Sequence, residues 1–390
     1  MTRFFMAMGL AVSLLFCFTP EIGAGQTSLD YPVKVLILSH VRSLDLKLLG
    51  PVKVKRFYTN EDLGRLGSGL LIKVKPAATG LVLGKEEFKI FGINLICPDI
   101  RKVNFSINKR NYRGGINLIR EADMSLSVIN QIPLEDYLGG VLPSEIPAVW
   151  PDAALEAQAI AARTYALYEA LRKQDKDFYL QADIRSQVYG GAGKEKNRTS
   201  RAVKKTRGKI LTYRGSIFPA YFHAACGGKR QDAARVWGID LKPLKTGPCG
   251  FCAYSPHQSW QKELTAEQVR QKISAAADLG RIGPVYVIDT LGRDRSERVV
   301  KVKIGHSEGS FSILADKFRM IMGPNNIKST NFKVKRVNNK FIFSGHGWGH
   351  GVGFCQWGAA GMAEKGYSAE QILKFYYPGS KITRVSDYIK

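Results

Sequence analysis

Residues 151–173, PDAALEAQAIAARTYALYEALRK, predict a helix with small side chains on nearly every face. Pro151 suits the first turn of a helix, and Asp152 would lie at its positive N-terminal end. The alanines responsible are Ala153, Ala154, Ala157, Ala159, Ala161, Ala162 and Ala166. Because such a helix has no broad polar face to turn towards water, we expect it to be buried against close neighbours.

Short apolar runs, broken by glycine and charged residues, occupy residues 31 to about 120 and predict strands. Further on, LTAEQVRQKISAAADLG and YSAEQILKFYYPG predict helices, the first opening with a capping box at Thr265 and Gln268. PVYVIDTLG and RVVKVKIG predict paired strands. Without a regular βαβ period, we expect an α+β fold: a β-rich N-terminal unit, and a mixed α/β region with the Ala-rich helix at its centre.

The first 24 residues have the layout of a cleaved signal peptide. Arg3 precedes an apolar run from Phe4 to Phe18, followed by Pro20 and the small residues Gly23 and Ala24. The run is shorter than a membrane-spanning helix requires. We therefore expect an exported protein that begins near Gly25, with no lipid anchor and no membrane span after cleavage. The expected domains are residues 25–115, which are β-rich, and residues 116–384.

The chain is strongly basic, with 58 Lys and Arg against 33 Asp and Glu and a formal net charge of +25. Such a charge favours polyanionic partners. For an exported protein we expect cell-wall polymers or anionic lipid surfaces rather than nucleic acid. The densest basic segment, residues 194–209, lacks interleaved aromatic residues and predicts a solvated helix face.

Glu145 is the first candidate for chemistry, because Pro143 and Pro147 restrict the backbone on both sides of it. The nearby Leu142, Ile146 and Trp150 would desolvate its carboxyl group and raise its pKa, whereas the start of the following helix would lower it. The alternative is a solvated acid leading into the helix. Within that helix, Arg163 is a candidate for binding substrate.

The segment SGHGWGHGVGFCQWG, residues 344–358, is the second candidate. As a strand it would place alternate glycines on one face, with His346, Trp348 and His350 on the other. A face of glycines implies close approach to the backbone, by a packed element or by a ligand such as a sugar. Two histidines beside a tryptophan suit recognition of a sugar or an acid-base role, and Gln356 on the same face could bind sugar hydroxyls. His346, His350 and Gln356 are therefore candidates for binding substrate, whereas two histidines alone would make an incomplete metal site.

Cysteines form the third candidate. Cys17 would leave with the signal peptide, and the five that remain include Cys226 and the CxxC pair Cys249 and Cys252. With His223 or His257 nearby, these three cysteines could form a structural Cys₃His zinc site. In an exported protein, a disulfide with one spare thiol is the main alternative, and simple packing is another.

Several motifs resemble the stage II sporulation protein D/LytB family. They are LEDYLGGVLPSEIPAVWPDAALEAQAIAARTYAL, SQVYGG, TRGKILTYRGSIFPAYFHAACGG, VWG, SPHQSW and GHGWGHGVGFCQWGAAGMAEKGYSAEQILKFYYPGSKI. They follow the family's order over residues 115–384. The N-terminal region resembles the family only weakly, at VKVLILS.

The resemblance implies a peptidoglycan lytic transglycosylase, active on glycan strands that are often stripped of their stem peptides. The catalytic acid of the family is the glutamate of an E-[MI]-P signature, here Glu145. One carboxylate suffices for such an enzyme, because the 6-hydroxyl of the sugar acts as nucleophile, and no cofactor is required. Some relatives carry zinc ligands just before QVY, but this chain has Arg185 and Ser186 there.

Two other functions remain open. LytB-type proteins are described as amidase enhancers, so the chain could bind glycan without cleaving it and assist a cell-wall amidase. A zinc hydrolase that uses the cysteines is the third hypothesis, which we rank last because thiolate-rich zinc sites are more often structural.

Overall fold

The computed structural model describes residues 31–276 and 279–389. The expected signal peptide, Cys17 and the expected start near Gly25 lie outside the described residues. Within them, none of the helices has both the length and the apolar character needed to cross a bilayer.

Two sheets form the N-terminal β-rich region, as predicted. The first has the order β13 (Leu180–Gln181), β1 (Pro32–Val41), β12 (Leu126–Pro133), β11 (Gly115–Arg120), β8 (Gly92–Ile96), β3 (Val52–Arg56), β4 (Asp62–Leu66). The second has the order β10 (Arg110–Tyr112), β9 (Phe105–Ile107), β2 (Leu44–Leu48), β5 (Leu71–Ala77), β6 (Gly80–Leu83), β7 (Glu86–Phe88). In β2 every second residue is buried, so apolar side chains from the two sheets share one core.

The first sheet continues past residue 115. β11 begins at that residue and β12 follows it; the two strands pair with each other, and β12 also pairs with β1. The same core extends into helices α1 (Leu134–Glu145) and α2 (Asp152–Arg172). The domain boundaries at residues 115 and 384 stay predictions.

Helix α2 is the predicted Ala-rich helix, and 15 of its 21 residues are buried. It contacts α1, α3 (Asn197–Lys205), α7 (Gln356–Glu364), α8 (Ala369–Tyr376) and β14 (Lys209–Tyr213). Alanine side chains let these neighbours approach from several sides, so the expectation of a buried central helix is confirmed. Helix α3 buries only Thr199, Ala202 and Val203, which leaves most of the basic segment in solvent.

Short elements complete the region around α2. Strand β14 pairs with β15 (Ser216–Ile217) and β26 (Lys381–Arg384), and β16 (Phe222–His223) pairs with β25 (Phe354–Cys355). The others are β17 (Lys229–Arg230), β18 (Gly247–Pro248), α4 (Ala233–Trp237), α9 (Val385–Tyr388) and the 3₁₀ turns η2 (Ala192–Lys194) and η3 (Lys242–Leu244). The C-terminal segment thus returns to pack against the central helix.

A second β-rich lobe lies between β18 and β25 in the sequence. Its sheets are β19 (Trp260–Thr265), β24 (Lys340–Gly345), β23 (Phe332–Val337), and β20 (Val285–Arg293), β21 (Val299–His306), β22 (Gly309–Leu314). Helices α5 (Ala266–Ser274) and α6 (Ala315–Met322) complete its separate core. The capping box at Thr265 and the pairing of β20 with β21 are as predicted.

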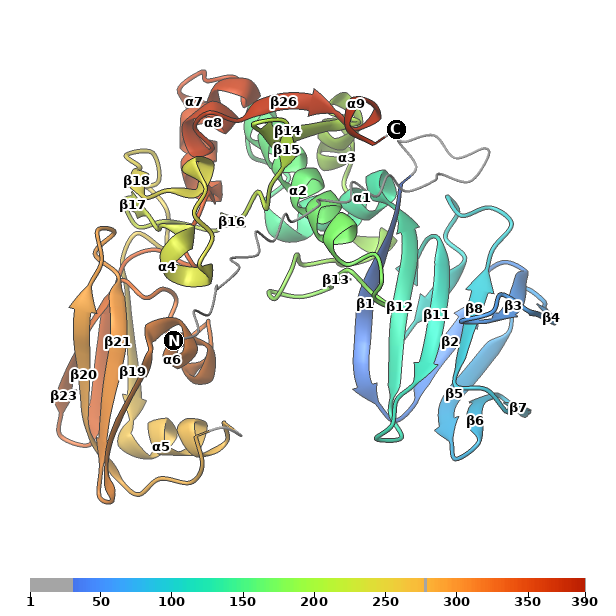
Figure 1. Ribbon diagram of the computed structural model, residues 1–390, viewed down its shortest axis with the longest axis horizontal. Helices are drawn as coiled ribbons and strands as arrows, with labels where there is room; N and C mark the ends of the chain where they lie inside the picture. Colours follow the sequence, from blue (N-terminus) through green and yellow to red (C-terminus); the bar gives the residue numbers. More distant parts are fainter. Residues whose placement is uncertain (1–30, 277–278, 390) are drawn as a thin grey trace, which may run out of the picture.

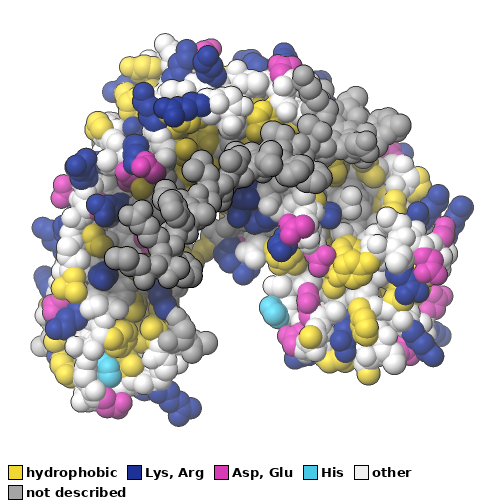
Figure 2. Space-filling model, in the orientation of Figure 1, with side chains coloured by type: hydrophobic (Ala, Val, Ile, Leu, Met, Phe, Trp, Pro, Cys, Tyr) yellow, Lys and Arg dark blue, Asp and Glu magenta, His cyan; other side chains and the backbone are white. Residues whose placement is uncertain are grey.

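The α+β architecture places helices α1 and α2 between two lobes. Figure 1 shows the N-terminal sheets on one side of α1 and α2, and the lobe of β19–β24 on the other. Figure 2 shows a hollow between the lobes, with Lys and Arg side chains visible in it.

The glycine-rich segment is not the predicted strand. β24 ends at Gly345 and β25 begins at Phe354, and the backbone between them is irregular. The φ angles of Gly347, Gly349, Gly351 and Gly353 are all positive, a conformation that glycine adopts without steric cost. A Cβ on Gly353 would lie 2.2 Å from the carbonyl oxygen of Tyr221. The predicted close approach to the backbone of the glycines therefore occurs. The element that approaches it is the segment around β16.

Candidate active site

Glu145 is the last residue of α1, rather than part of a loop leading into α2. Its Oε1 accepts a hydrogen bond of 2.7 Å from the backbone N–H of Val188, and its Oε2 lies 3.4 Å from Nε2 of Gln356. The residue is half-buried. Burial raises the pKa of Glu145 to about 7, against the opposing effect of these two donors. At neutral pH this carboxyl group can therefore both give and accept a proton.

The SQVYGG segment supplies the first of these donors and is itself anchored on both sides of Val188. Gln187 accepts a hydrogen bond from the Tyr137 hydroxyl and donates to the carbonyl of Ala162. The Tyr189 hydroxyl donates to Asn130. These anchors fix the peptide that points at Glu145. The role of this segment was not predicted from the sequence.

Gln356 comes from the other end of the chain. It is the first residue of α7 and only 4% exposed, with Cys355 as the N-cap. Of the predicted candidates for binding substrate, it is the one with a hydrogen bond to Glu145 in the described structure.

The four acids nearest to Glu145 in the sequence are engaged elsewhere in the described chain. Asp152 pairs with Arg198 and Glu156 with Lys205. Glu135 pairs with Arg163, and Asp136 lies in a separate pocket with Arg113 and Glu195.

The placement of Arg163 does not fit the predicted contact with substrate. Its side chain is fully buried and forms two 2.8 Å hydrogen bonds with the Glu135 carboxylate. It also donates to the carbonyl oxygens of Val203 and Lys209. The guanidinium thus joins α1 and α2 to the end of α3 and the start of β14, with no face turned to solvent.

The two histidines lie in different pockets. His346 is exposed and lines a pocket with Trp260, Arg293 and Lys333. His350 lines another, with Trp237.

Both ring nitrogens of His350 are occupied, since Nε2 donates to the carbonyl of Phe222 and Nδ1 accepts from the N–H of Val352. Burial lowers the pKa of His350 well below 6.5. It is therefore neutral and held by the fold. Binding of substrate by the two histidines stays a prediction, and neither has a contact with Glu145 among the interactions of the described residues.

A row of aromatic side chains includes Trp357, the residue that follows Gln356 in the sequence. The rings of Trp150 and Trp357 meet edge to face at 5.0 Å, and Tyr254 lies 5.5 Å from Trp357. His257 lies 6.4 Å from Trp357 and 4.5 Å from Trp348. We call these five residues the aromatic row. Of this row, only Trp348 was named from the sequence together with the candidate sugar-binding residues.

The cysteines gather into one buried group of four. The sulfur atoms of Cys226, Cys249, Cys252 and Cys355 all lie within 4.8 Å of one another. His257 instead contacts Trp348 and Lys328, so the fourth member is a cysteine rather than the predicted histidine. Cys355 was visible in the sequence but lies more than 100 residues from the CxxC pair, and no local spacing linked them.

Comparison with known proteins assigns two parts of the chain. The stage II sporulation protein (SpoIID) family model matches residues 122–213, which contain Glu145, α2 and Val188. A domain of unknown function, DUF8618, matches residues 254–353, which contain the second β-rich lobe.

The chain is 36% identical over 343 residues to an uncharacterized protein of Brachyspira hyodysenteriae, covering 86% of this chain and 89% of that protein. It is 30% identical to the amidase enhancer of Bacillus subtilis, over 77% of this chain but only 48% of that longer protein. It is 28% identical to stage II sporulation protein D of the same organism, over 70% of this chain and 80% of the relative.

Proposed function

The chain belongs to the SpoIID/LytB family, and from this premise we propose that it is exported and acts on the cell wall as a peptidoglycan lytic transglycosylase. Its substrate is the glycan strand, including strands stripped of their stem peptides. Glu145 is the catalytic acid and base, and the reaction needs no cofactor.

The environment of Glu145 carries this proposal, because its carboxyl group is half-buried at the end of α1 and hydrogen-bonded to Val188 and Gln356. An ordinary glutamate is almost fully ionised at neutral pH, whereas burial raises the pKa of this one to about 7. A general acid works best when its pKa lies near the working pH. The 2.7 Å bond from Val188 engages Oε1, which leaves Oε2, with its longer contact to Gln356, to carry the proton.

The reaction follows from one carboxyl group that acts twice. Protonated Glu145 gives its proton to the glycosidic oxygen as the bond after N-acetylmuramic acid breaks. The Glu145 carboxylate then accepts the proton of the 6-hydroxyl of that sugar. At the same time the oxygen of this hydroxyl forms a bond to C1 of the same sugar. The products are a 1,6-anhydro end and a free 4-hydroxyl; no water is consumed, and Glu145 ends protonated as it began.

The aromatic row is the proposed platform for the glycan strand. Tyr254 is 47% exposed, and Trp150, Trp348 and Trp357 are half-buried, so their rings offer apolar surface to a passing strand. Trp357 directly follows Gln356, the residue that contacts Glu145, so the aromatic row is connected to the catalytic acid through the start of α7. Stripped strands keep the lactyl carboxylates of N-acetylmuramic acid, which suit the chain's net charge of +25.

A second candidate is a non-catalytic amidase enhancer that uses the same surface to hold glycan for a partner amidase. The relative named amidase enhancer, 30% identical to this chain, favours it. In that case Glu145 would contribute to binding of the glycan and would not transfer a proton.

One experiment separates the two candidates. The mature protein is incubated with purified peptide-free strands alone, and separately with intact peptidoglycan and a cell-wall amidase. A transglycosylase shortens the free strands without the amidase. Intact strands together with faster release of peptides would support the enhancer instead. Asp152→Asn is a suitable control, because this acid lies near Glu145 in the sequence but is 69% exposed and paired with Arg198.

A further inference from the structure

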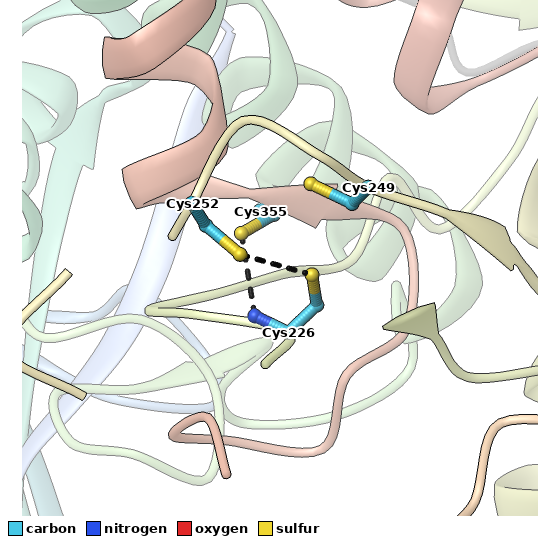
Figure 3. A group of neighbouring side chains, drawn as sticks. All are labelled: Cys226, Cys249, Cys252 and Cys355. Atoms are coloured by element: carbon cyan, nitrogen blue, oxygen red, sulfur yellow. Dashed lines mark hydrogen bonds between the residues drawn. The ribbon is translucent and has the colours of Figure 1, made fainter. Parts of the chain in front are cut away.

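Four cysteines from three separate segments converge on one point in the core. Cys226 follows β16, Cys249 and Cys252 follow β18, and Cys355 ends β25. Each is at most 2% exposed. Figure 3 shows the four side chains pointing towards one another from these segments.

The spacing of the sulfur atoms suits a metal. In a tetrahedral Zn–thiolate site with Zn–S bonds of about 2.3 Å, neighbouring sulfurs lie about 3.8 Å apart. Here all four lie within 4.8 Å of one another, and those of Cys226 and Cys252 are 3.4 Å apart. Four ligands close such a site and leave no position for substrate, which is the pattern of a structural zinc.

The surroundings suit an anionic cluster. The Cys355 sulfur accepts hydrogen bonds from the backbone N–H groups of Cys226 and Gly358, and the Tyr376 hydroxyl lies 3.3 Å from the Cys249 sulfur. Such second contacts orient the ligands of metal sites. A Cβ on Gly358 would lie 2.9 Å from the Cys249 sulfur, so glycine is needed for this approach.

Two buried arginines strengthen this argument. Arg298 is fully buried and donates to the carbonyl of Cys226, while its Nε and Nη1 have no hydrogen-bond partner among the described residues. Arg230 is 6% exposed, and its Nε is likewise without a partner there. A buried charge needs compensation. One Zn²⁺ with four thiolates carries a net charge of −2, and Arg298, on which Asp294 and Asp316 also act, offsets part of that charge.

We propose that Cys226, Cys249, Cys252 and Cys355 bind one structural Zn²⁺, and that this ion positions Gln356 beside Glu145. Cys355 is the N-cap of α7 and directly precedes Gln356. The metal fixes the first turn of α7 to the segments after β16 and β18. The backbone that carries Gln356 is thereby held in place, and with it the side-chain amide that contacts Glu145. The assignment does not depend on which reaction Glu145 performs.

The test begins with the metal content of the full mature protein, purified without chelator. We expect one zinc per chain in the wild type and in Cys97→Ser, which removes a buried cysteine outside the cluster, and a loss of zinc in Cys355→Ser. Cobalt in place of zinc should give the visible absorption of a tetrahedral thiolate site. Zinc retained at full occupancy by a folded Cys355→Ser would overturn the ligand set.

Because Cys355→Ser could fail to fold, the wild type supplies an independent measurement. After denaturation with chelator and without reductant, all five cysteines of the described chain should be alkylated. Disulfides among the four, or five free thiols in a folded protein that holds no zinc, would overturn the proposal.

Discussion

Glu145 lies where burial and hydrogen bonding oppose each other, and its pKa of about 7 results from that balance. Sequence could predict the acid and the apolar side chains around it. It could not predict the resulting pKa of Glu145, because the two hydrogen-bond donors come from Val188, 43 residues away, and Gln356, 211 residues away. Contacts at such separations are set by the fold and have no local signature.

At the residue scale we predict the pH dependence of strand cleavage. The protonated carboxyl is the active form of the free enzyme, so kcat/KM should fall as pH rises through about 7. In Gln356→Leu the descending limb should move to higher pH, because the lost amide donor stabilises the carboxylate. Initial rates on stripped strands across the pH range would measure both curves. An unchanged limb in this variant would show that Gln356 has no influence on the acid.

The folding stability of the protein should also depend on pH through the ionisation of Glu145. Burial raises the folded pKa above the ordinary 4.5, so the folded state binds the proton more tightly than the unfolded chain. The associated stability is fully present below about pH 4.5 and is lost as pH rises to about 7. Glu145→Gln should therefore unfold at a higher temperature than the wild type at pH 8, with the difference reduced or gone at pH 4. A Tm equal to that of the wild type at both pH values would contradict a raised pKa.

At the scale of elements, regular patterns predicted regular structure. The burial of α2, the capping box of α5 and the pairing of β20 with β21 all follow from local composition. The glycine-rich segment does not form the strand that its glycine at every second position predicted. A strand requires negative φ angles, and four of these glycines have positive ones. Period-two spacing is shared by strands and by chains that alternate between extended and left-handed residues, so the sequence alone could not distinguish them.

A pair of substitutions tests why glycine is needed there. Gly353 and Gly366 both have positive φ angles, but a Cβ would lie 2.2 Å from the carbonyl oxygen of Tyr221 at Gly353 and meet nothing within 4 Å at Gly366. Gly366→Ala should cost only the ~1–2 kcal/mol of a left-handed alanine. Gly353→Ala should cost about 1–3 kcal/mol more, because the backbone must shift. Urea unfolding would compare the two, and equal costs would show that the approach of Tyr221 imposes no restriction.

At the scale of the whole molecule, the chain surrounds α2 with segments from both ends. The α+β class followed from the order of predicted elements. The separate second lobe did not, because its strands and helices resemble those of the flanking regions in composition and only its own core sets it apart. The aromatic row depends on this arrangement, since Trp150 precedes the second lobe in the sequence and Trp357 follows it.

In the proposed reaction, one carboxyl group transfers both protons and no water is consumed. The most direct test is mass spectrometry of stripped glycan strands cleaved in ¹⁸O-labelled water by the wild type and by Glu145→Gln. We predict 1,6-anhydro ends without label from the wild type. The variant should bind strands normally but lose roughly 10²- to 10⁴-fold in rate, the usual contribution of general acid-base catalysis. Labelled reducing ends, or a variant as fast as the wild type, would contradict the assignment of Glu145.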